Sequence, residues 1–374
     1  MTSMTSHTSH TSHTSHTSHT SHSAGLHAYS GGDPTPLLME ALLRYQGFDE
    51  RGTRIPPDAF NALNAHGRWA AADGLPPAAD ALSRLGALEA VPRSYVALGE
   101  LLSLVEFAGA GADAATELKL RGGATLVSLQ RPPHSVFTEQ LKVLLDRSAE
   151  RATRAAEILV QASPADAFWS SVLGLRADRH RRTMEFLNVA LSFTVFVVFR
   201  FKQSSLCPRP FEYTSLMEPL LQTPGHDAWP SGHATESHLM ARLLSILAAG
   251  KRDAVANLPE DSLQRLAYRI SRNREVAGLH FPTDTTAGRV LGDTLARFLV
   301  SVCEAEAAPA WPTIALAPDW YAPAGGAEER RDESFIPVGD LIGTMSTGVA
   351  PWTEAAPVVT YAKHLWELAK AEWN

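Results

Sequence analysis

Apolar residues recur every three or four positions over most of the chain beyond residue 34, and this spacing predicts amphipathic helices. One long helix is predicted over 135–162, with leucines and alanines on one side and arginines and glutamates on the other. Few segments alternate apolar and polar residues with a period of two, so the predicted class is all-α, a helical bundle. The other predicted helices cover 36–45, 93–107, 166–176, 180–201, 233–249, 260–273, 284–305 and 360–372.

Stretches rich in proline and glycine separate these helices, at 208–210, 223–225 and 281–283. A larger Pro/Gly-rich stretch follows residue 308 and runs to residue 348. The expected organisation has three parts. These are a tail over 1–33, an all-α domain over 34–308, and an extension over 309–374 whose final helix packs back onto the bundle.

The N-terminal tail consists of Thr-Ser-His repeats that end at His22. Such a segment has no apolar surface to bury, so it is expected to be disordered. Its histidines could chelate zinc or nickel. A low-complexity tail without a dedicated function is the favoured interpretation.

The most apolar stretch, residues 186–199, is shorter than a bilayer span and contains Asn188 and Thr194. Arg200 and Lys202 follow it directly, and we expect a buried core helix rather than a membrane anchor. The chain also shows no basic segment followed by an apolar core at its start, so no secretory signal is recognised. The expectation is a cytoplasmic or otherwise soluble protein without an integral membrane segment.

The formal net charge of −7 argues against a general binder of nucleic acid or anionic membranes. Any chemistry on anions must therefore use a local group of cations. The two cysteines, Cys207 and Cys303, do not form a disulfide framework, which favours a reducing compartment.

Three segments contain such cations, at 202–210, 224–233 and 274–284. Guanidinium groups bind oxyanion oxygens in pairs, an ammonium adds a point charge, and a serine hydroxyl and a glycine N–H add short donors. The segments supply these groups and two histidines, one of which has a carboxylate four residues later. The residues are Lys202, Arg209, Arg274, Ser231, Gly232, His233, His280 and Asp284.

Ser231, Gly232 and His233 lead directly into an apolar-periodic run, so they are expected at a helix N-terminus. Free N–H groups and the helix dipole favour negative charge there. Glycine at 232 also lets the backbone approach an anion closely. Each segment alone is also compatible with a solvated cation pair, a core histidine or a helix cap, but their combination in this order favours an oxyanion site.

The spacing resembles the Lys-x6-Arg-Pro, Pro-Ser-Gly-His and Ser-Arg-x5-His-x3-Asp signature shared by vanadium haloperoxidases and type 2 phosphatidic acid phosphatases. Asn273 replaces the serine before the arginine, a peripheral position at which asparagine can still donate and accept hydrogen bonds. The signature covers about eighty residues. The flanking helices fit the family's all-α core in outline, and residues 34–130 show no resemblance.

The resemblance implies a role for each matched position. His280 would bond the vanadium, or attack phosphorus in a phosphatase, and Asp284 would orient its ring. His233 would be the acid–base group. The oxygens of vanadate, or of phosphate as a competing oxyanion, would be held by Lys202, Arg209, Arg274, Ser231 and Gly232.

Vanadate and phosphate have nearly the same shape, so the signature does not choose between the two activities. The absence of several apolar spans, the Ala-Thr-Glu continuation after His233, and His226 favour a haloperoxidase. His226 lies five residues before Ser231 and could tune the oxyanion or position a halide, although it could also be a plain loop residue. His238 is expected on the helix surface, and Phe199 and Trp229 either line a halide site or belong to the core.

The favoured hypothesis is thus a haloperoxidase that uses hydrogen peroxide to oxidise halide, bromide first, to hypohalous acid, which halogenates a small organic substrate. Vanadium would remain pentavalent as a Lewis acid. The alternative is a soluble phosphatase in which His280 forms a phosphohistidine and His233 protonates the leaving oxygen. A metal-sequestering protein built around the tail is disfavoured because it would leave the signature without a use. A homo-oligomer is expected by analogy with the family.

Overall fold

The computed structural model describes residues 81–109, 114–162, 165–249, 258–304, 311–316, 346–350 and 359–373. The chain divides into two compact units, one of Gly25–Arg93 and the other of Met1–Ala24 with Ser94–Asn374. The described part of the first unit is α4 (Ala81–Ala87) and the beginning of α5 (Ala90–Ser103). The predicted tail over 1–33 and the predicted helix over 36–45 lie outside the described residues.

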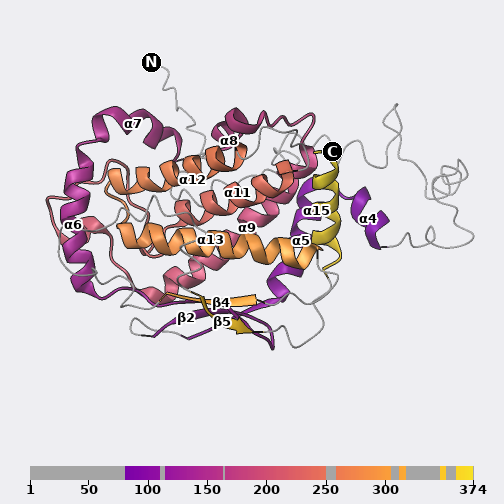
Figure 1. Ribbon diagram of the computed structural model, residues 1–374, viewed down its shortest axis with the longest axis horizontal. Coiled ribbons are helices and arrows are strands. Elements are labelled where there is room, and N and C mark those ends of the chain that lie inside the picture. Colours follow the sequence, from indigo (N-terminus) through magenta and orange to yellow (C-terminus); the bar gives the residue numbers. More distant parts are fainter. Residues whose placement is uncertain are drawn as a thin grey trace, which may run out of the picture. The chain divides into compact units, whose positions relative to one another are not determined.

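The second unit is mostly helical, which confirms the predicted class. Figure 1 shows α11, α12 and α13 side by side, with α6 across one end and α15 at the other. These helices start and end within a few residues of the predicted limits. They are α8 (Asp166–Leu173), α9 (Arg181–Ser205), α11 (Gly232–Ala248), α12 (Leu258–Val276), α13 (Pro282–Glu304) and α15 (Tyr361–Ala371). The short helix α10 (Pro210–Tyr213) was not predicted. The helix predicted over 93–107 is wrong at its end, because α5 stops at Ser103 and a strand covers Val105–Ala108.

The long helix predicted over 135–162 is instead two helices, α6 (His134–Ser148) and α7 (Arg151–Val160). At their junction Ala149 N–H and Glu150 N–H bond to carbonyls only three residues back. This tighter turn changes the direction of the chain between the two helices. Neither proline nor glycine marks the junction, so the apolar periodicity continues through it.

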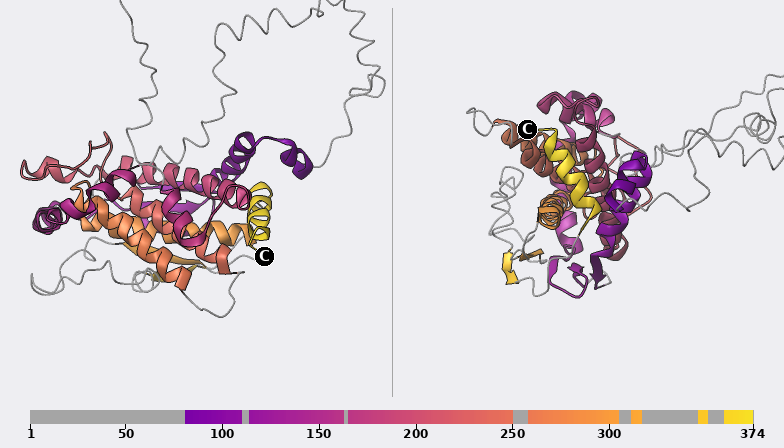
Figure 2. Two further views of the ribbon diagram at one scale, coloured as in Figure 1. Left: turned by 90° about the horizontal axis from the view of Figure 1, so that it is seen from above. Right: turned by 90° about the vertical axis from the view of Figure 1, so that its right-hand side faces the viewer.

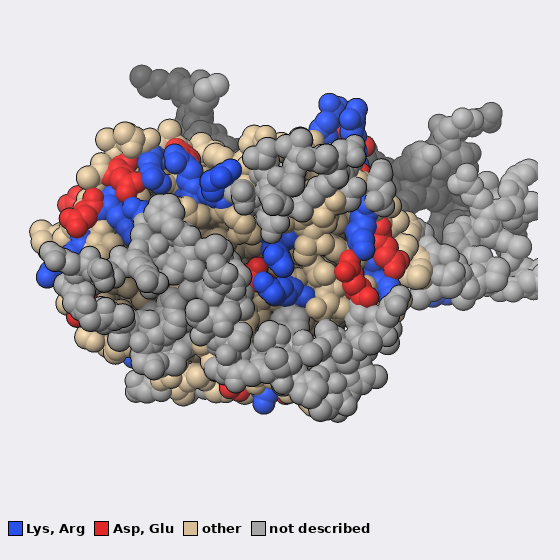
Figure 3. Space-filling view, viewed as in Figure 1, with Lys and Arg blue, Asp and Glu red and all other residues tan. Residues whose placement is uncertain are grey.

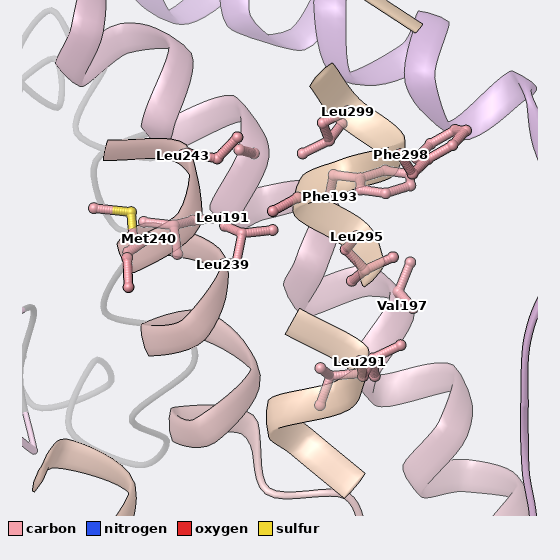
Figure 4. Close-up of a cluster of buried hydrophobic side chains, with 14 of the residues drawn as sticks. Leu191, Phe193, Val197, Leu239, Met240, Leu243, Leu291, Leu295, Phe298 and Leu299 are labelled. Carbon is pink, nitrogen blue, oxygen red and sulfur yellow. The ribbon is translucent and has the colours of Figure 1, made fainter. Parts of the chain in front are cut away.

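The core of the bundle lies between α9, α11 and α13. Figure 4 shows leucines and phenylalanines from these three helices that meet in one cluster. Phe193 of α9 stacks on Phe298 of α13 with ring centroids 5.8 Å apart. Each fully buried side chain of this size contributes about 1.5–3 kcal/mol relative to an exposed one. This cluster therefore fixes the helices that carry the candidate site.

Helix α9 belongs to this core although it is long and apolar enough to cross a membrane. In the part of the chain that the structure describes it is the one stretch of this kind, within Arg181–Tyr213. Its most apolar window is 67% buried inside the protein, which fits the predicted core helix.

A five-stranded sheet, which the sequence analysis did not predict, packs beside α13 (Figure 1). Its order is β1-β2-β3-β4-β5, and all neighbours are antiparallel except β3 and β4. The strands are β1 (Val105–Ala108), β2 (Thr116–Leu120), β3 (Thr125–Leu129), β4 (Trp311–Leu316) and β5 (Ser346–Ala350). Buried Thr116, Leu118 and Leu120 alternate with partly buried polar neighbours before a turn at Gly122, so a hairpin signal was present.

The C-terminal helix α15 packs onto α9 and α13 (Figure 2). Carboxylates from distant parts of the chain cap the N-terminal ends of α9 and α15. Glu372, just after α15, accepts hydrogen bonds from the backbone N–H groups of Arg182 and Thr183 at the start of α9. Glu100 accepts the N–H groups of residues 360–362 at the start of α15.

Two glycines on α13 bring its backbone unusually close to α11. A Cβ atom on Gly288 would lie 2.4 Å from the carbonyl oxygen of Ser231, and one on Gly292 would lie 2.2 Å from that of Thr235. Only glycine fits at such separations. Because Ser231 precedes α11, this contact also sets where the N-terminus of α11 lies relative to α13.

Replacing Gly288 or Gly292 by alanine should therefore separate the two helices. We expect each variant to lower the free energy of unfolding by about 1–3 kcal/mol, the usual effect of overpacking. Urea denaturation followed by circular dichroism measures this change. Gly99→Ala is the control, because an added Cβ meets no atom within 4 Å at that exposed position of α5. That variant should be neutral or slightly stabilising, and equal losses in all three variants would contradict the close-packing account.

Candidate active site

The predicted site residues are positioned at helix ends and in the loops between them. Lys202 lies in the last turn of α9, and Arg209 precedes α10. Ser231 caps α11, whose first residues are Gly232 and His233. His226 lies in the loop before this cap, Arg274 lies near the end of α12, His280 follows that helix, and Asp284 lies in the first turn of α13.

Two cations, Lys202 and Arg209, share one set of backbone carbonyls. Lys202 Nζ donates to the carbonyls of Asp227 and Ala228 at 2.7 and 2.8 Å. Arg209 donates to the carbonyl of His226 and, through Nη1, to the carbonyl of Leu279 at 2.9 Å. Both side chains are buried. The loop 226–228 thus holds the ammonium and the guanidinium together.

His280 is fixed by a carboxylate on one ring nitrogen and faces a guanidinium with the other. Its Nδ1 lies 3.1 Å from Asp284 Oδ2, which also accepts the backbone N–H of Phe281 at 2.9 Å. Its Nε2 lies 3.3 Å from Arg209 Nη1. Because arginine only donates, Nε2 accepts and Nδ1 carries the proton. The lone pair of Nε2 therefore points toward the cation cluster.

Burial shifts the pKa values of the charged groups in this cluster. Burial lowers the pKa of Lys202 well below its usual value, and the neighbouring Arg209 lowers it further, while Asp284 acts in the opposite direction. Burial lowers the pKa of Arg209 to about 10. It raises the pKa of Asp284 to about 7, although the Phe281 N–H, Lys202 and Arg209 oppose that shift. Burial thus disfavours the charged form of all three groups.

The start of α11 joins this cluster through its backbone. Ser231 N–H donates to the carbonyl of Asp284 at 2.9 Å, and Ser231 Oγ accepts the N–H of Ala234 at 3.4 Å. This confirms the expected helix cap. His233 Nε2 lies 3.1 Å from the carbonyl of Gln161. A carbonyl only accepts, so Nε2 of His233 carries a proton.

Arg274 is completely buried and only partly paired. Its Nη2 donates to the carbonyl of Ile158 at 2.8 Å. Within the described residues its Nε and Nη1 have no hydrogen-bond partner. Burial lowers its pKa to about 10. Unpaired buried donors are rare in folded proteins, so a ligand with acceptor oxygens is expected beside this guanidinium.

His226 reaches the cluster through Arg209. Its Nδ1 lies 3.1 Å from Arg209 Nη2, and its half-buried ring meets the edge of Phe199 with centroids 5.1 Å apart. The histidine is therefore part of the site's surroundings rather than a remote loop residue. Trp229 is 1% exposed and belongs to the hydrophobic core, which agrees with the simpler of the two interpretations for that residue.

Some features around the site could not be predicted from the amino-acid sequence. His238, expected on the surface of α11, is 2% exposed, because α11 is covered by α12 and α13. Ile158 and Gln161 were not predicted to take part. They act through backbone carbonyls, which no residue type signals. Hydrogen bonds connect Arg209 with His226 and with His280, and His280 in turn bonds to Asp284. Arg274 and His233 instead bond to backbone carbonyls at the end of α7.

The helical bundle thus gathers buried cations and an oriented histidine at its helix ends, which are the groups that an oxyanion would need. Residues 184–306 match the model of the PAP2 superfamily, which agrees with the resemblance that the signature indicated. The matched region contains all the predicted site residues.

Among solved structures, the crystal structure of a bacterial vanadium-dependent iodoperoxidase is similar to part of the chain. The sequence identity is 18% and the TM-score 0.34, over 44% of this chain and 48% of that protein. The chain thus spans about half the length of that protein. No curated protein matches the sequence.

The donor set fits a tetrahedral oxyanion, and Lys202 provides a direct test. We expect phosphate to stabilise the native protein and so raise its melting temperature. At a phosphate concentration of a hundred times the Kd, the free energy of unfolding should increase by about 2.7 kcal/mol. Lys202→Met should lose this response. Its ligand-free stability should stay within about 1 kcal/mol of native, because removal of a desolvated cation beside Arg209 offsets the lost hydrogen bonds. A variant that still responds fully to phosphate would contradict the assignment.

The lowered pKa of Lys202 also predicts how binding depends on pH. A bound anion favours the charged ammonium of Lys202. Above the lowered pKa that Lys202 has in the ligand-free protein, binding of the anion must therefore be accompanied by uptake of a proton. Phosphate affinity should therefore decrease as the pH rises from 7 to 10. Calorimetric titrations at several pH values measure this, and an affinity that increases with pH would be incompatible with a cationic Lys202 in the site.

Proposed function

We propose that the protein is a vanadate-dependent haloperoxidase that uses hydrogen peroxide to oxidise halide, bromide first, and so halogenates a small organic substrate. The oxyanion site alone would serve a phosphatase equally well. The observation that carries the choice is His226, whose half-buried ring lies against Arg209 and Phe199 beside the cation cluster. An imidazole at this place adds a titratable group next to the oxyanion without replacing any residue of the signature.

The residues fit vanadate as a resident group. The oxygens would be held by the buried cations and by the start of α11, and Nε2 of His280 would bond the metal. When bound, vanadate supplies a Lewis acid that activates hydrogen peroxide toward halide. The Nε and Nη1 donors of Arg274, which have no hydrogen-bond partner in the described part of the chain, are the observation that supports this fit. The oxygen-holding residues are Lys202, Arg209, Arg274, Ser231 and Gly232.

The chain's own residues have distinct tasks in this proposal. Asp284 holds the proton on Nδ1 of His280 and so keeps the Nε2 lone pair directed at the cations. The carbonyls of 226–228 hold Lys202 and Arg209 in place before an anion arrives, so little reorganisation is needed. His233, at the first turn of α11, moves protons to and from the peroxide and the product oxygen.

Phosphomonoester hydrolysis is the second candidate, and the geometry of His280 supports it specifically. A neutral imidazole with its Nδ1–H on a carboxylate and its Nε2 facing arginine is arranged as a nucleophile. Nε2 would form a bond to phosphorus while the ester P–O bond breaks, and His233 would donate its proton to the leaving oxygen. Water would then cleave the phosphohistidine. A metal-binding role of the N-terminal tail lies outside the described residues.

One paired assay separates the two activities. Protein loaded with orthovanadate should brominate a phenol-type dye in the presence of peroxide and bromide, and p-nitrophenyl phosphate should be hydrolysed slowly without vanadate. Hydrolysis at a high rate together with no bromination at any vanadate concentration would contradict the haloperoxidase proposal. Bromination together with slow hydrolysis would support it.

His280→Ala should abolish both activities, because it removes the only nitrogen proposed to bond the central atom. His226→Ala should instead reduce bromination by about tenfold or more while phosphate affinity stays within about threefold, since the equatorial donors remain. Steady-state kinetics and calorimetry measure these effects. Full turnover in His280→Ala would refute the site assignment, and unchanged bromination in His226→Ala would remove the argument for that residue.

A further inference from the structure

The last turn of α7 reaches into the proposed active site through its backbone. The carbonyl of Ile158 accepts Nη2 of Arg274 at 2.8 Å, and the carbonyl of Gln161 accepts Nε2 of His233 at 3.1 Å. The last carbonyls of a helix have no partner within that helix and lie at the negative end of its dipole. This turn therefore orients a cation and the proposed acid–base histidine at the same time.

Asn273 connects this turn of α7 to α12. Its Oδ1 accepts Nη1 of Arg154 at 3.0 Å, and its Nδ2 donates to Glu157 Oε1 at 3.0 Å and to Gln161 Oε1 at 2.8 Å. The side chain is completely buried. Both amide hydrogens and the amide oxygen are thus used. Two of the partners lie on α7 and the third, Gln161, is its C-cap residue.

An ion pair at the protein surface also connects α7 with α12. Arg269 of α12 makes a bidentate ion pair with Glu157. Its Nε donates to Oε1 at 2.7 Å and to Oε2 at 2.9 Å, and its Nη2 donates to Oε2 at 2.6 Å. Burial raises the pKa of Glu157, but hydrogen bonds from Arg269, Asn273 and Gln161 outweigh it, so the net pKa is lowered and Glu157 remains an ionised acceptor. Figure 3 shows acidic and basic side chains intermixed over the region where α7 and α12 lie.

Asparagine suits this position better than the serine that the signature places there. A serine hydroxyl has one proton to donate, whereas the three partners of Asn273 need two donors and one acceptor. Among the described residues, the side chain of Asn273 forms hydrogen bonds with Arg154, Glu157 and Gln161 and none with Lys202, Arg209 or His280. Its influence on the site must therefore pass through the turn that contains Ile158 and Gln161.

We propose that Asn273 is a positioning residue of the active site, which clamps the last turn of α7 on α12 so that the carbonyls of Ile158 and Gln161 hold Arg274 and His233. This inference rests on the proposed function of the site as an oxyanion-dependent enzyme. It assigns to α7, which lies outside the matched family region, a part in setting the geometry of the chemistry.

The first test replaces Asn273 by alanine and measures binding and turnover separately. Because Arg274 would lose its fixed orientation, the Kd for inorganic phosphate should rise about tenfold. Because His233 would lose its anchor, kcat for the activity that the native enzyme shows should fall about tenfold or more, beyond any change in KM. Calorimetry gives the first value and steady-state kinetics the second.

A rescue experiment tests the donor pattern itself. Asn273→Asp places a carboxylate against Glu157, so its phosphate affinity should be at least as weak as that of the alanine variant. Adding Glu157→Gln to Asn273→Asp restores a donor–acceptor pair and should recover at least threefold of the lost affinity, although Glu157→Gln alone is expected to weaken binding. A purely structural loss would not be recovered by a second substitution that also removes the Arg269 ion pair.

Leu299→Ala is the matched control for lost stability. Leu299 is buried in α13, about 22 Å along the helix from Asp284 at 1.5 Å per residue. It should lower the melting temperature without changing the phosphate Kd or kcat. The inference is overturned if Asn273→Ala keeps native affinity and kcat, or if Leu299→Ala alters them equally. Native protein that binds phosphate without either enzyme activity would refute the proposed function, while the affinity measurements would still decide the role of Asn273.

Discussion

The burial of three cations, Lys202, Arg209 and Arg274, is the constraint on which the candidate site depends. Removing such charges from water is unfavourable unless acceptors surround them. The chain supplies backbone carbonyls from the loop 226–228, from Leu279 and from Ile158. Asp284 of α13 places a carboxylate near Lys202 and Arg209, and it also holds His280. An oxyanion would complete this arrangement, because it brings the negative charge and the acceptor oxygens that the described part of the site lacks.

The fold keeps these groups together by fixing the ends of its helices. Gly288 and Gly292 let α13 approach α11 so closely that the cap at Ser231 bonds to the backbone of Asp284. The hydrophobic cluster of α9, α11 and α13 holds the same helices from the other side. Stability is thus concentrated in helix packing, and the site occupies the places where helix ends meet, which is where free N–H and carbonyl groups are available.

Much of the bundle and of the site could be predicted from the sequence, for identifiable reasons. Helices such as α11 and α13 show apolar periodicity and clear ends. The chemistry of the signature residues resides in their side chains, so it follows directly from the residue types. The pairing of β4 and β5 could not be predicted, because these strands are short and distant in sequence from β1–β3 and depend on tertiary contacts. The hairpin of β2 and β3 did carry a signal in the sequence, which the apolar periodicity of the neighbouring helices outweighed. The carbonyls of Ile158 and Gln161 were missed because a backbone group can belong to any residue.

The most direct test of the account is a calorimetric titration of the protein with orthovanadate, alone and with excess inorganic phosphate. The account predicts one vanadate per chain, competition by phosphate for the same site, and loss of both ligands in Arg209→Ala, because a single cluster of buried cations holds either oxyanion. Binding of vanadate that phosphate does not displace, or that survives in Arg209→Ala, would contradict the claim that these cations form one oxyanion site.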